Sequence, residues 1–290
     1  MVVEFLGTGT SHGIPVVGCS CPVCHSQDPK DQRYRASLLI RGNTGECCVI
    51  DTGPEFRLQA IRAGIQHLDA VFLTHAHADH LHGLDDVRPL SVHTPLNVFG
   101  NRPTIHELTE RFSYIFRETQ IGGGKPRIIP TILDPEWPEH KQQHTTEDPE
   151  ASVSIGGLRF TPLPVYHGRL HILGWLVEEA GRRCAYLTDV SQIPKETLLL
   201  LAQLDILIIG ALRKLPHPTH FSFDQALDII NLVRPRQAYL THLCHDYFHT
   251  AIFEYLLEQG FSQNYVAPAY DGLRLMLEPL SERHGTTAGV

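Results

Sequence analysis

Short runs of apolar, often β-branched residues recur along the chain, and each lies ahead of a residue that can ionise or bind a metal. Continuous apolar runs of this length are typical of strands buried on both faces. Three of the runs end in Leu-Thr directly before His or Asp. We therefore expect one functional site at one edge of the predicted sheets. The runs are residues 49–50 before Asp51, 70–74 before His75, 160–165 before His167, 184–188 before Asp189 and 238–241 before His242.

Helical patterns of apolar residues lie between these runs. Ser222 comes just before one of them and Gly260 just after the last, and both are residues that commonly cap helices. Strands that alternate with helices in this way indicate an α/β fold built in layers. The predicted helices cover residues 56–63, 81–90, 104–116, 195–204, 223–233 and 250–259.

The stretch from about residue 122 to 157 breaks this alternation. It contains three consecutive glycines, several prolines and a polar run over residues 139–150. We interpret it as an insertion or an exposed loop between two halves of one domain, which is predicted to cover residues 1–280. Residues 281–290 are expected to form a disordered tail.

Composition narrows the classes of function. The 290 residues are 42% hydrophobic, which is ordinary for a globular core, and the net charge is −8. Lys and Arg are scattered, so the basic stripe that nonspecific nucleic-acid binding needs is absent from the sequence, and an anionic substrate must be attracted locally. The N-terminus has no basic, cleavable leader and no run approaches about 18 apolar residues. A cytoplasmic protein without a membrane partner is expected.

The segment His75-Ala-His77-Ala-Asp79-His80 is the strongest chemical signal in the chain. His75 and His77 are two residues apart, so at a strand end they point to the same side and can bind one ion. Asp79 and His80 follow where a helix should begin, and they can reach a second ion. Imidazole suits Zn, Mn or Fe, and a carboxylate compensates charge. Histidines on the surface or satisfied in the core are the alternative, but so many ligand types in six residues have no packing rationale.

A second group of metal-binding side chains is rich in cysteine. The chain has seven cysteines, and three of them lie too close together to bridge one another without strain, so thiols that partly hold metal are expected rather than disulfides. Three thiolates in six residues supply three-quarters of a tetrahedral structural zinc site, and reduced thiols without metal are the alternative. The three are Cys19, Cys21 and Cys24. The candidates for the fourth ligand are Cys244, His245 and the sterically awkward His25.

The His-x-His-x-Asp-His motif, together with the later His167, Asp189 and His242, resembles the ligand set of the metallo-β-lactamase superfamily. The resemblance implies a four-layer αββα sandwich with mixed β-sheets and a catalytic site for two divalent metal ions, Zn or Mn. It also implies that Asp51 orients a ligand histidine; a turn-forming role before Gly53 is the alternative. On this resemblance one ion is held by His75, His77 and His167, the other by Asp79, His80 and His242, and Asp189 bridges the two.

The N-terminal loop resembles one branch of this superfamily, the phosphoribosyl 1,2-cyclic phosphate phosphodiesterases. The similarity rests on Gly-Thr-Gly-Thr-Ser-His-Gly-Ile-Pro followed by Cys-x-Cys-x-x-Cys. It implies that His245 completes the structural zinc site. It also implies that His220 contacts the substrate phosphate or protonates the leaving alkoxide, the alternative being an exposed loop histidine. The candidate catalytic residues are thus Asp79 and His220, and the segment from about 113 to 157 is longer here than in that branch.

These features predict a metal-dependent hydrolase that cleaves a small phosphodiester, first of all a cyclic phosphate such as 5-phosphoribosyl 1,2-cyclic phosphate, with a metal-bridging hydroxide. Thioester or lactam hydrolysis and tRNA 3′-end processing by the same metals are alternatives. A noncatalytic metal-binding protein is the alternative outside enzymes. The pyrroloquinoline-quinone biosynthesis protein B branch has a similar cysteine loop but lacks the intact histidine motif, which this chain keeps. No nucleic-acid partner is expected, and a homodimer is compatible with the sequence.

Overall fold

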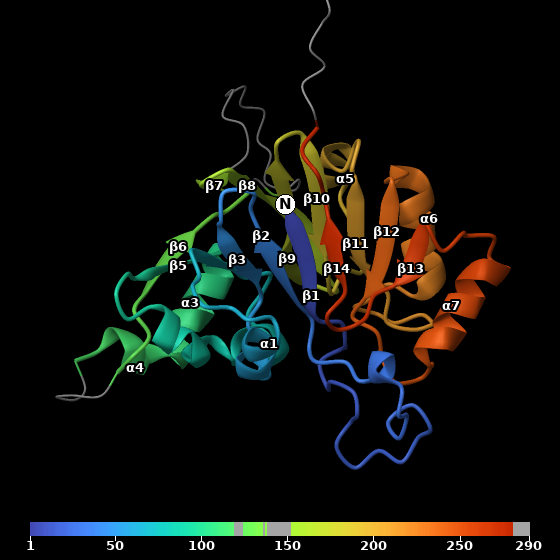
Figure 1. The fold of residues 1–290 in the computed structure, drawn as a ribbon, viewed down its shortest axis with the longest axis horizontal. Helices are drawn as coiled ribbons and strands as arrows, with labels where there is room; N and C mark the ends of the chain where they lie inside the picture. The colour runs from blue at the N-terminus through green and yellow to red at the C-terminus, as the bar shows by residue number, and fades with distance from the viewer. Residues whose placement is uncertain (119–123, 136, 138–151, 281–290) are drawn as a thin grey trace, which may run out of the picture.

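The computed structural model describes residues 1–118, 124–135, 137 and 152–280. Two seven-stranded sheets face each other, and helices cover the outer face of each (Figure 1). This arrangement confirms the predicted four-layer αββα sandwich. Within the described ranges, no helix combines the length and apolar character needed to cross a bilayer. The predicted disordered tail, residues 281–290, lies outside the described residues.

The first sheet has the strand order β14-β1-β2-β3-β4-β5-β6. Its strands are antiparallel from β14 to β3 and parallel from β3 to β6, so the sheet is mixed, as predicted. The strands are β1 (Val2–Gly7), β2 (Ser37–Arg41), β3 (Cys47–Ile50), β4 (Ala70–Phe72), β5 (Leu96–Gly100), β6 (Ile128–Ile132) and β14 (Arg274–Met276).

The second sheet has the order β13-β12-β11-β10-β9-β8-β7 and is also mixed. Its strands are parallel from β13 to β10 and antiparallel from β10 to β7. Since β8 and β10 are both antiparallel to β9, they run in the same direction and end at the same edge. The strands are β7 (Val153–Ile155), β8 (Leu158–His167), β9 (Leu170–Glu179), β10 (Arg182–Leu187), β11 (Ile206–Gly210), β12 (Gln237–Thr241) and β13 (Val266–Pro268).

An apolar core between the two sheets fixes their relative position. The ring of Phe72, the last residue of β4, lies 3.8 Å from the ring of Phe160 in β8 and 5.0 Å from the ring of Trp175 in β9, measured between centroids. All three side chains are fully buried. Burial of aromatic side chains is a large source of folding free energy. These contacts also fix the point where the chain leaves β4 for His75.

The outer layers bury the apolar faces of the helices, α1 to α4 on the first sheet and α5 to α7 on the second. Helix α6 matches its predicted range because Ser222 and Gln225 form a reciprocal capping box at its start. The α-helices are α1 (Phe56–Arg62), α2 (Ala78–Leu81), α3 (Arg102–Arg111), α4 (Ser113–Phe116), α5 (Lys195–Leu200), α6 (Phe223–Val233) and α7 (His249–Glu258), and the 3₁₀ helices are η1 (Pro29–Asp31) and η2 (Leu84–Leu90).

Three predictions about local structure are wrong in part. The helix expected over residues 81–90 is mostly the 3₁₀ helix η2, which contains Pro89, and proline cannot donate the hydrogen bond of an α-helical interior. The helix expected over residues 104–116 breaks at Phe112 into α3 and α4. The stretch from 122 to 157 contains β6 and β7, each at the edge of a sheet. An edge position tolerates Pro130 within β6.

Candidate metal centre

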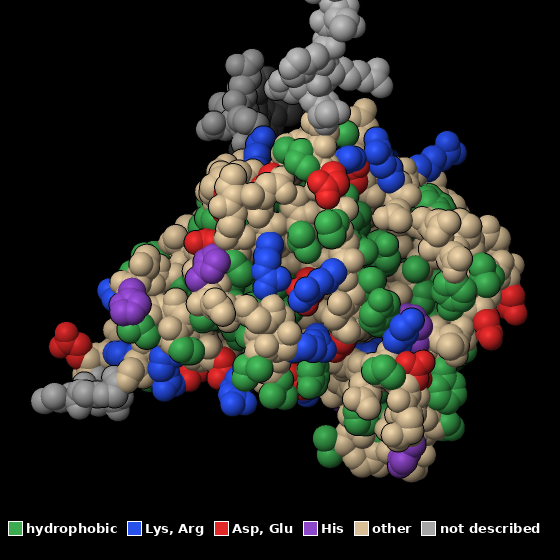
Figure 2. Space-filling view, in the orientation of Figure 1, with side chains coloured by type: hydrophobic (Ala, Val, Ile, Leu, Met, Phe, Trp, Pro, Cys, Tyr) green, Lys and Arg blue, Asp and Glu red, His purple; other side chains and the backbone are tan. Residues whose placement is uncertain are grey.

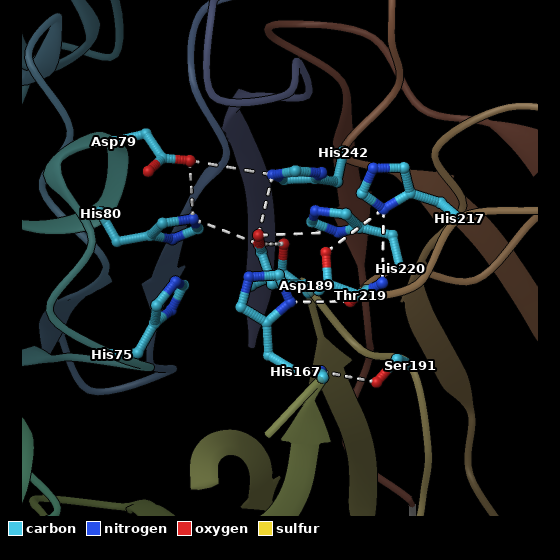
Figure 3. Close-up of polar contacts among 12 residues, drawn as sticks. His75, Asp79, His80, His167, Asp189, Ser191, His217, Thr219, His220 and His242 are labelled. Carbon is cyan, nitrogen blue, oxygen red and sulfur yellow. Dashed lines mark hydrogen bonds and ion pairs between the residues drawn. The ribbon is translucent and has the colours of Figure 1, made fainter. Parts of the chain in front are cut away.

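The strand ends that carry the predicted ligands meet at one edge of the sandwich (Figure 3). Three of the residues just past these ends have positive φ angles, which non-glycine residues rarely adopt. The angles are 64° for Asp51 after β3, 51° for Asp189 after β10 and 57° for His242 after β12. Residues held in such conformations cluster at functional sites, where the surrounding structure outweighs the strain. Here the left-handed turn redirects each side chain at the point where its strand ends.

One group of candidate ligands consists of histidines alone. The ring centroid of His77 lies 4.5 Å from that of His75 and 5.2 Å from that of His167. One ring nitrogen from each of the three lies within 4.8 Å of the others, which is close enough to share an ion. His77 is exposed whereas the other two are buried, so this group is open to solvent on the side of His77.

A second group lies beside the first and contains both acidic ligands. Oδ2 of Asp189 is 3.1 Å from Nε2 of His80, and Oδ1 of Asp189 is 3.1 Å from Nε2 of His242. Oδ2 of Asp79 is 3.1 Å from the same nitrogen of His80 (Figure 3). Asp189 also lies within ligand distance of His167 from the first group. The structure therefore places Asp189 between the two groups, where a bridging ligand would have to lie.

The hydrogen bonding of the buried ring nitrogens shows whether these residues could hold metal ions. Nε2 of His75 and Nδ1 of His242 are buried and have no hydrogen-bond partner within the described part of the chain, while Nε2 of His80 and Nε2 of His242 lie 3.1 Å from carboxylates without the geometry of a hydrogen bond. Buried polar atoms are normally paired, so such a cluster points to a missing binding partner. Nδ1 of His80 lies 2.7 Å from Asp51, and Nδ1 of His167 lies 2.7 Å from the carbonyl oxygen of Thr219. These contacts leave the Nε2 atoms free to bind metal.

The charges of the second group also indicate that these residues could hold metal ions. Burial lowers the pKa of His80, but the charges of Asp79, Asp189 and Asp51 outweigh burial and hold this pKa well above its usual range. Burial raises the pKa of Asp189, but His242 and His80 outweigh it and hold this pKa well below its usual range. Three carboxylates around one imidazole are a surplus of negative charge that bound cations would neutralise. The donor set fits divalent ions with mixed N and O ligands.

The histidine-rich turn before α6 forms one wall of the site. The ring of His220 stacks on that of His242 with centroids 4.9 Å apart and lies 4.7 Å from the ring of His167. Burial, with the charge of His242, lowers the pKa of His220 to about 3, so its imidazole is neutral at pH 7. A neutral imidazole can donate a hydrogen bond or bind a metal, and a ring nitrogen of His220 lies within 4.8 Å of ligand atoms of His167 and Asp189. The structure also brings in Thr219, which the sequence does not single out, because its contribution is a backbone carbonyl.

The cysteine loop projects from the sheets between β1 and β2 (Figure 1) and meets the chain beyond β12. Nδ1 of His245 lies 3.4 Å from Sγ of Cys19 and 3.5 Å from the sulfurs of Cys21 and Cys24. In a tetrahedral zinc site, ligand bonds of about 2.0 to 2.3 Å give N-to-S distances of about 3.5 Å. Backbone N–H groups also point at the sulfurs of Cys19, Cys21 and Cys24, as expected for thiolates.

The other two candidates for the fourth ligand of the cysteine cluster lie apart from it. The ring of His25 turns away, with Nδ1 3.1 Å from the carbonyl oxygen of Cys21. The sulfur of Cys244 accepts a hydrogen bond from the backbone of Asp246. The structure therefore groups the three cysteines of the loop with His245, and this set fits a closed metal site.

Comparison with known proteins identifies the superfamily of the chain. Residues 48–243 match the model of the Beta-lactamase superfamily domain. The chain is 36% identical over 274 residues to an octanoyltransferase of Porphyromonas gingivalis, a match that covers 94% of the chain but 51% of that relative, so the chain spans about half its length.

Solved structures agree with this placement. A diphosphatase from the PhnP family superposes with a TM-score of 0.79 and 35% identity, over 96% of this chain and 98% of that one. The zinc-bound PqqB of Methylobacterium extorquens superposes with a TM-score of 0.73 over 96% of this chain and 100% of that one, but at 16% identity it shares only the fold. The chain therefore belongs to the metallo-β-lactamase superfamily, and within it to the PhnP family.

Proposed function

We propose that this hydrolase cleaves a phosphodiester bond in a small molecule, with a cyclic phosphate such as 5-phosphoribosyl 1,2-cyclic phosphate as the first candidate. The observation that carries the proposal is the position of Asp189 between two adjoining groups of unsatisfied ligand atoms. Two divalent ions in such groups, zinc or manganese, would supply an activated water and stabilise charge on the phosphoryl oxygens. The paired groups suit phosphoryl chemistry better than a lone ion would.

The residues around the metal ligands would bind and orient the anionic substrate. His220 would donate a hydrogen bond to a phosphoryl oxygen or to the leaving oxygen. Nε of Arg213, in the loop after β11, is buried and has no hydrogen-bond partner among the described residues. Its charge also contributes to lowering the pKa of His217, after burial, which puts the guanidinium near the histidine-rich turn. An unpaired cation at this place would attract an anion to a chain whose net charge is −8.

The face of the molecule drawn in Figure 2 favours a small substrate over a nucleic acid. On the face seen in Figure 2, Lys and Arg side chains lie among acidic ones rather than in a continuous basic stripe. Nonspecific binding of a polyanion needs several such cations in a row. We therefore propose a small-molecule partner, and a tRNA 3′-end as substrate is disfavoured.

A diphosphate bond is the second candidate, because the solved relative at 35% identity is a diphosphatase. Both substrates would present a phosphoryl group to the metal centre and differ in the leaving group, which is an alkoxide in the first case and a phosphate in the second. The test is a panel of substrates on enzyme with a measured metal content, comparing a sugar 1,2-cyclic phosphate, a linear diphosphate and an acyl thioester. We expect turnover of one of the phosphorus compounds and none of the thioester. Faster thioester hydrolysis would overturn the proposal.

A further inference from the structure

The turn made by residues 216–220 lies against the candidate ligand His167. Nδ1 of His167 is 2.7 Å from the carbonyl oxygen of Thr219 (Figure 3). A carbonyl oxygen can only accept a hydrogen bond, so Nδ1 carries the proton and Nε2 keeps its lone pair. The position of this carbonyl therefore decides which nitrogen of His167 can bind a metal.

His217 contacts the residue that supplies this carbonyl. Nδ1 of His217 lies 3.4 Å from the backbone nitrogen of Thr219 and 3.2 Å from its Oγ1. A backbone N–H can only donate, so Nδ1 of His217 is the acceptor in this contact. A side chain that accepts from the backbone N–H two residues later is the arrangement that Asn and Asp adopt in an Asx turn.

The other side of the turn packs closely against the segments that carry Asp189 and His167. The backbone nitrogen of Phe221 donates to the carbonyl oxygen of Val190, 2.7 Å away and next to Asp189. A Cβ atom on Gly168, the neighbour of His167, would lie 2.9 Å from Cγ2 of Thr219. Thr219 is thus in close contact with the strand end that carries His167.

We propose that His217 is a positioning residue for the three-histidine metal group: it holds the turn so that the Thr219 carbonyl selects Nε2 of His167 as the ligand atom. His217 acts here without touching the metal and without transferring a proton. The inference rests on His75, His77 and His167 forming a metal site, as in the proposed function, and does not depend on the substrate.

The test compares His217→Ala, His217→Asn and the control His106→Ala, which removes an exposed histidine on α3. Each full-length protein is loaded with Co²⁺, and a chelator competes for the ion. The absorption of thiolate-bound Co²⁺ at the cysteine cluster separates that site from the histidine-bound ions and reports that the protein is folded. We expect His217→Ala to weaken Co²⁺ binding at the histidine site by about tenfold or more. His217→Asn, which can form the Asx turn, and His106→Ala should bind like the unaltered protein.

Two results would overturn this role of His217. One is His217→Ala with unaltered Co²⁺ affinity at the histidine site. The other is His217→Asn as weak as His217→Ala, because the imidazole itself and not the turn would then be needed. A protein that binds Co²⁺ as expected but cleaves no phosphodiester or diphosphate would contradict the proposed function and leave the role of His217 intact.

Discussion

Oδ2 of Asp51 lies 2.7 Å from Nδ1 of His80, and solvent reaches neither side chain. The same carboxylate accepts two hydrogen bonds from Thr74, one from its backbone nitrogen and one from Oγ1. A carboxylate only accepts, so Nδ1 of His80 donates and its Nε2 faces Asp79 and Asp189. Asp51 therefore orients a candidate ligand, as the resemblance implied.

Asp51→Asn should weaken metal binding at the group that contains His80 by about ten- to a hundredfold. The backbone N–H of Thr74 can only donate, so the amide oxygen of Asn would stay with it and the amide nitrogen would face Nδ1 of His80. His80 would then have to accept at Nδ1 and carry its proton on Nε2, which could no longer bind a metal. Chelator competition on the purified variant measures the effect. Asp228→Asn, an exposed change on α6, is the matched control. Unchanged metal affinity in Asp51→Asn would mean that the carboxylate of Asp51 is not needed to orient His80.

Asp189→Ala should abolish hydrolysis and reduce the occupancy of both histidine groups, because this carboxylate lies between them. Metal analysis and steady-state kinetics on the same preparation check the prediction, with Asp228→Ala as the control. Near-normal turnover with full metal content would remove Asp189 from the site.

His220→Ala should keep both catalytic metals and lose about a hundredfold or more in rate, since His220 acts on the substrate rather than on the ions. Comparing substrates with good and poor leaving groups separates its two possible contacts. An equal loss on both indicates contact with a phosphoryl oxygen, and a loss confined to poor leaving groups indicates proton donation to the leaving oxygen. A large loss of metal would instead identify His220 as a ligand.

Arg213→Gln should raise KM for the anionic substrate by about tenfold, equivalent to about 1.4 kcal/mol, with little change in kcat. The neighbouring cation supplies the control, because the ammonium of Lys214 lies over the rings of Tyr247 and Tyr255. Lys214→Gln removes the same charge and should leave KM nearly unchanged. Equal effects of the two variants would show a general influence of charge rather than a contact of Arg213.

Cys21→Ser should lose one tightly held metal ion per chain and melt at a lower temperature, while the folded fraction still hydrolyses phosphodiesters. The three cysteines and His245 join segments that are far apart in sequence, so metal binding there adds to the free energy of unfolding. Cys244→Ser is the control, since that sulfur lies outside the cluster. A Cys21→Ser protein with its metal and melting temperature unchanged would show that the cysteines are ordinary thiols.

The ligand segment from His75 to His80 could be predicted from the sequence because its donors lie within six residues. The apolar runs before His167, Asp189 and His242 predicted that these residues lie at one edge of the sheets, but their roles as metal ligands needed the resemblance. The start of helix α6 was predicted at the correct residue because Ser222 and Gln225 are a recognisable capping box.

The features that could not be predicted depend on backbone atoms or on position in the sheet. The carbonyl of Thr219 acts through an atom that every residue has, so no side-chain pattern signals it. Strands β6 and β7 lie at sheet edges, where one side of the strand is unpaired, and β6 contains Pro130, which argues against a strand when only the sequence is known. Neither strand has a fully buried residue, and β7 is only three residues long, so neither gives the long apolar run that marks the buried strands.

The left-handed backbone at Asp51, Asp189 and His242 also bears on how such a protein can evolve. Each of these residues costs the fold about 1 kcal/mol that glycine would not, so the chain keeps them against its own stability. Glycine would relieve this strain, but it would also leave buried donors without a partner, such as the two of Thr74 and the one of His80 that bond Asp51. A descendant released from selection for hydrolysis would therefore have to lose these buried polar contacts together with the strained backbone before it gained stability.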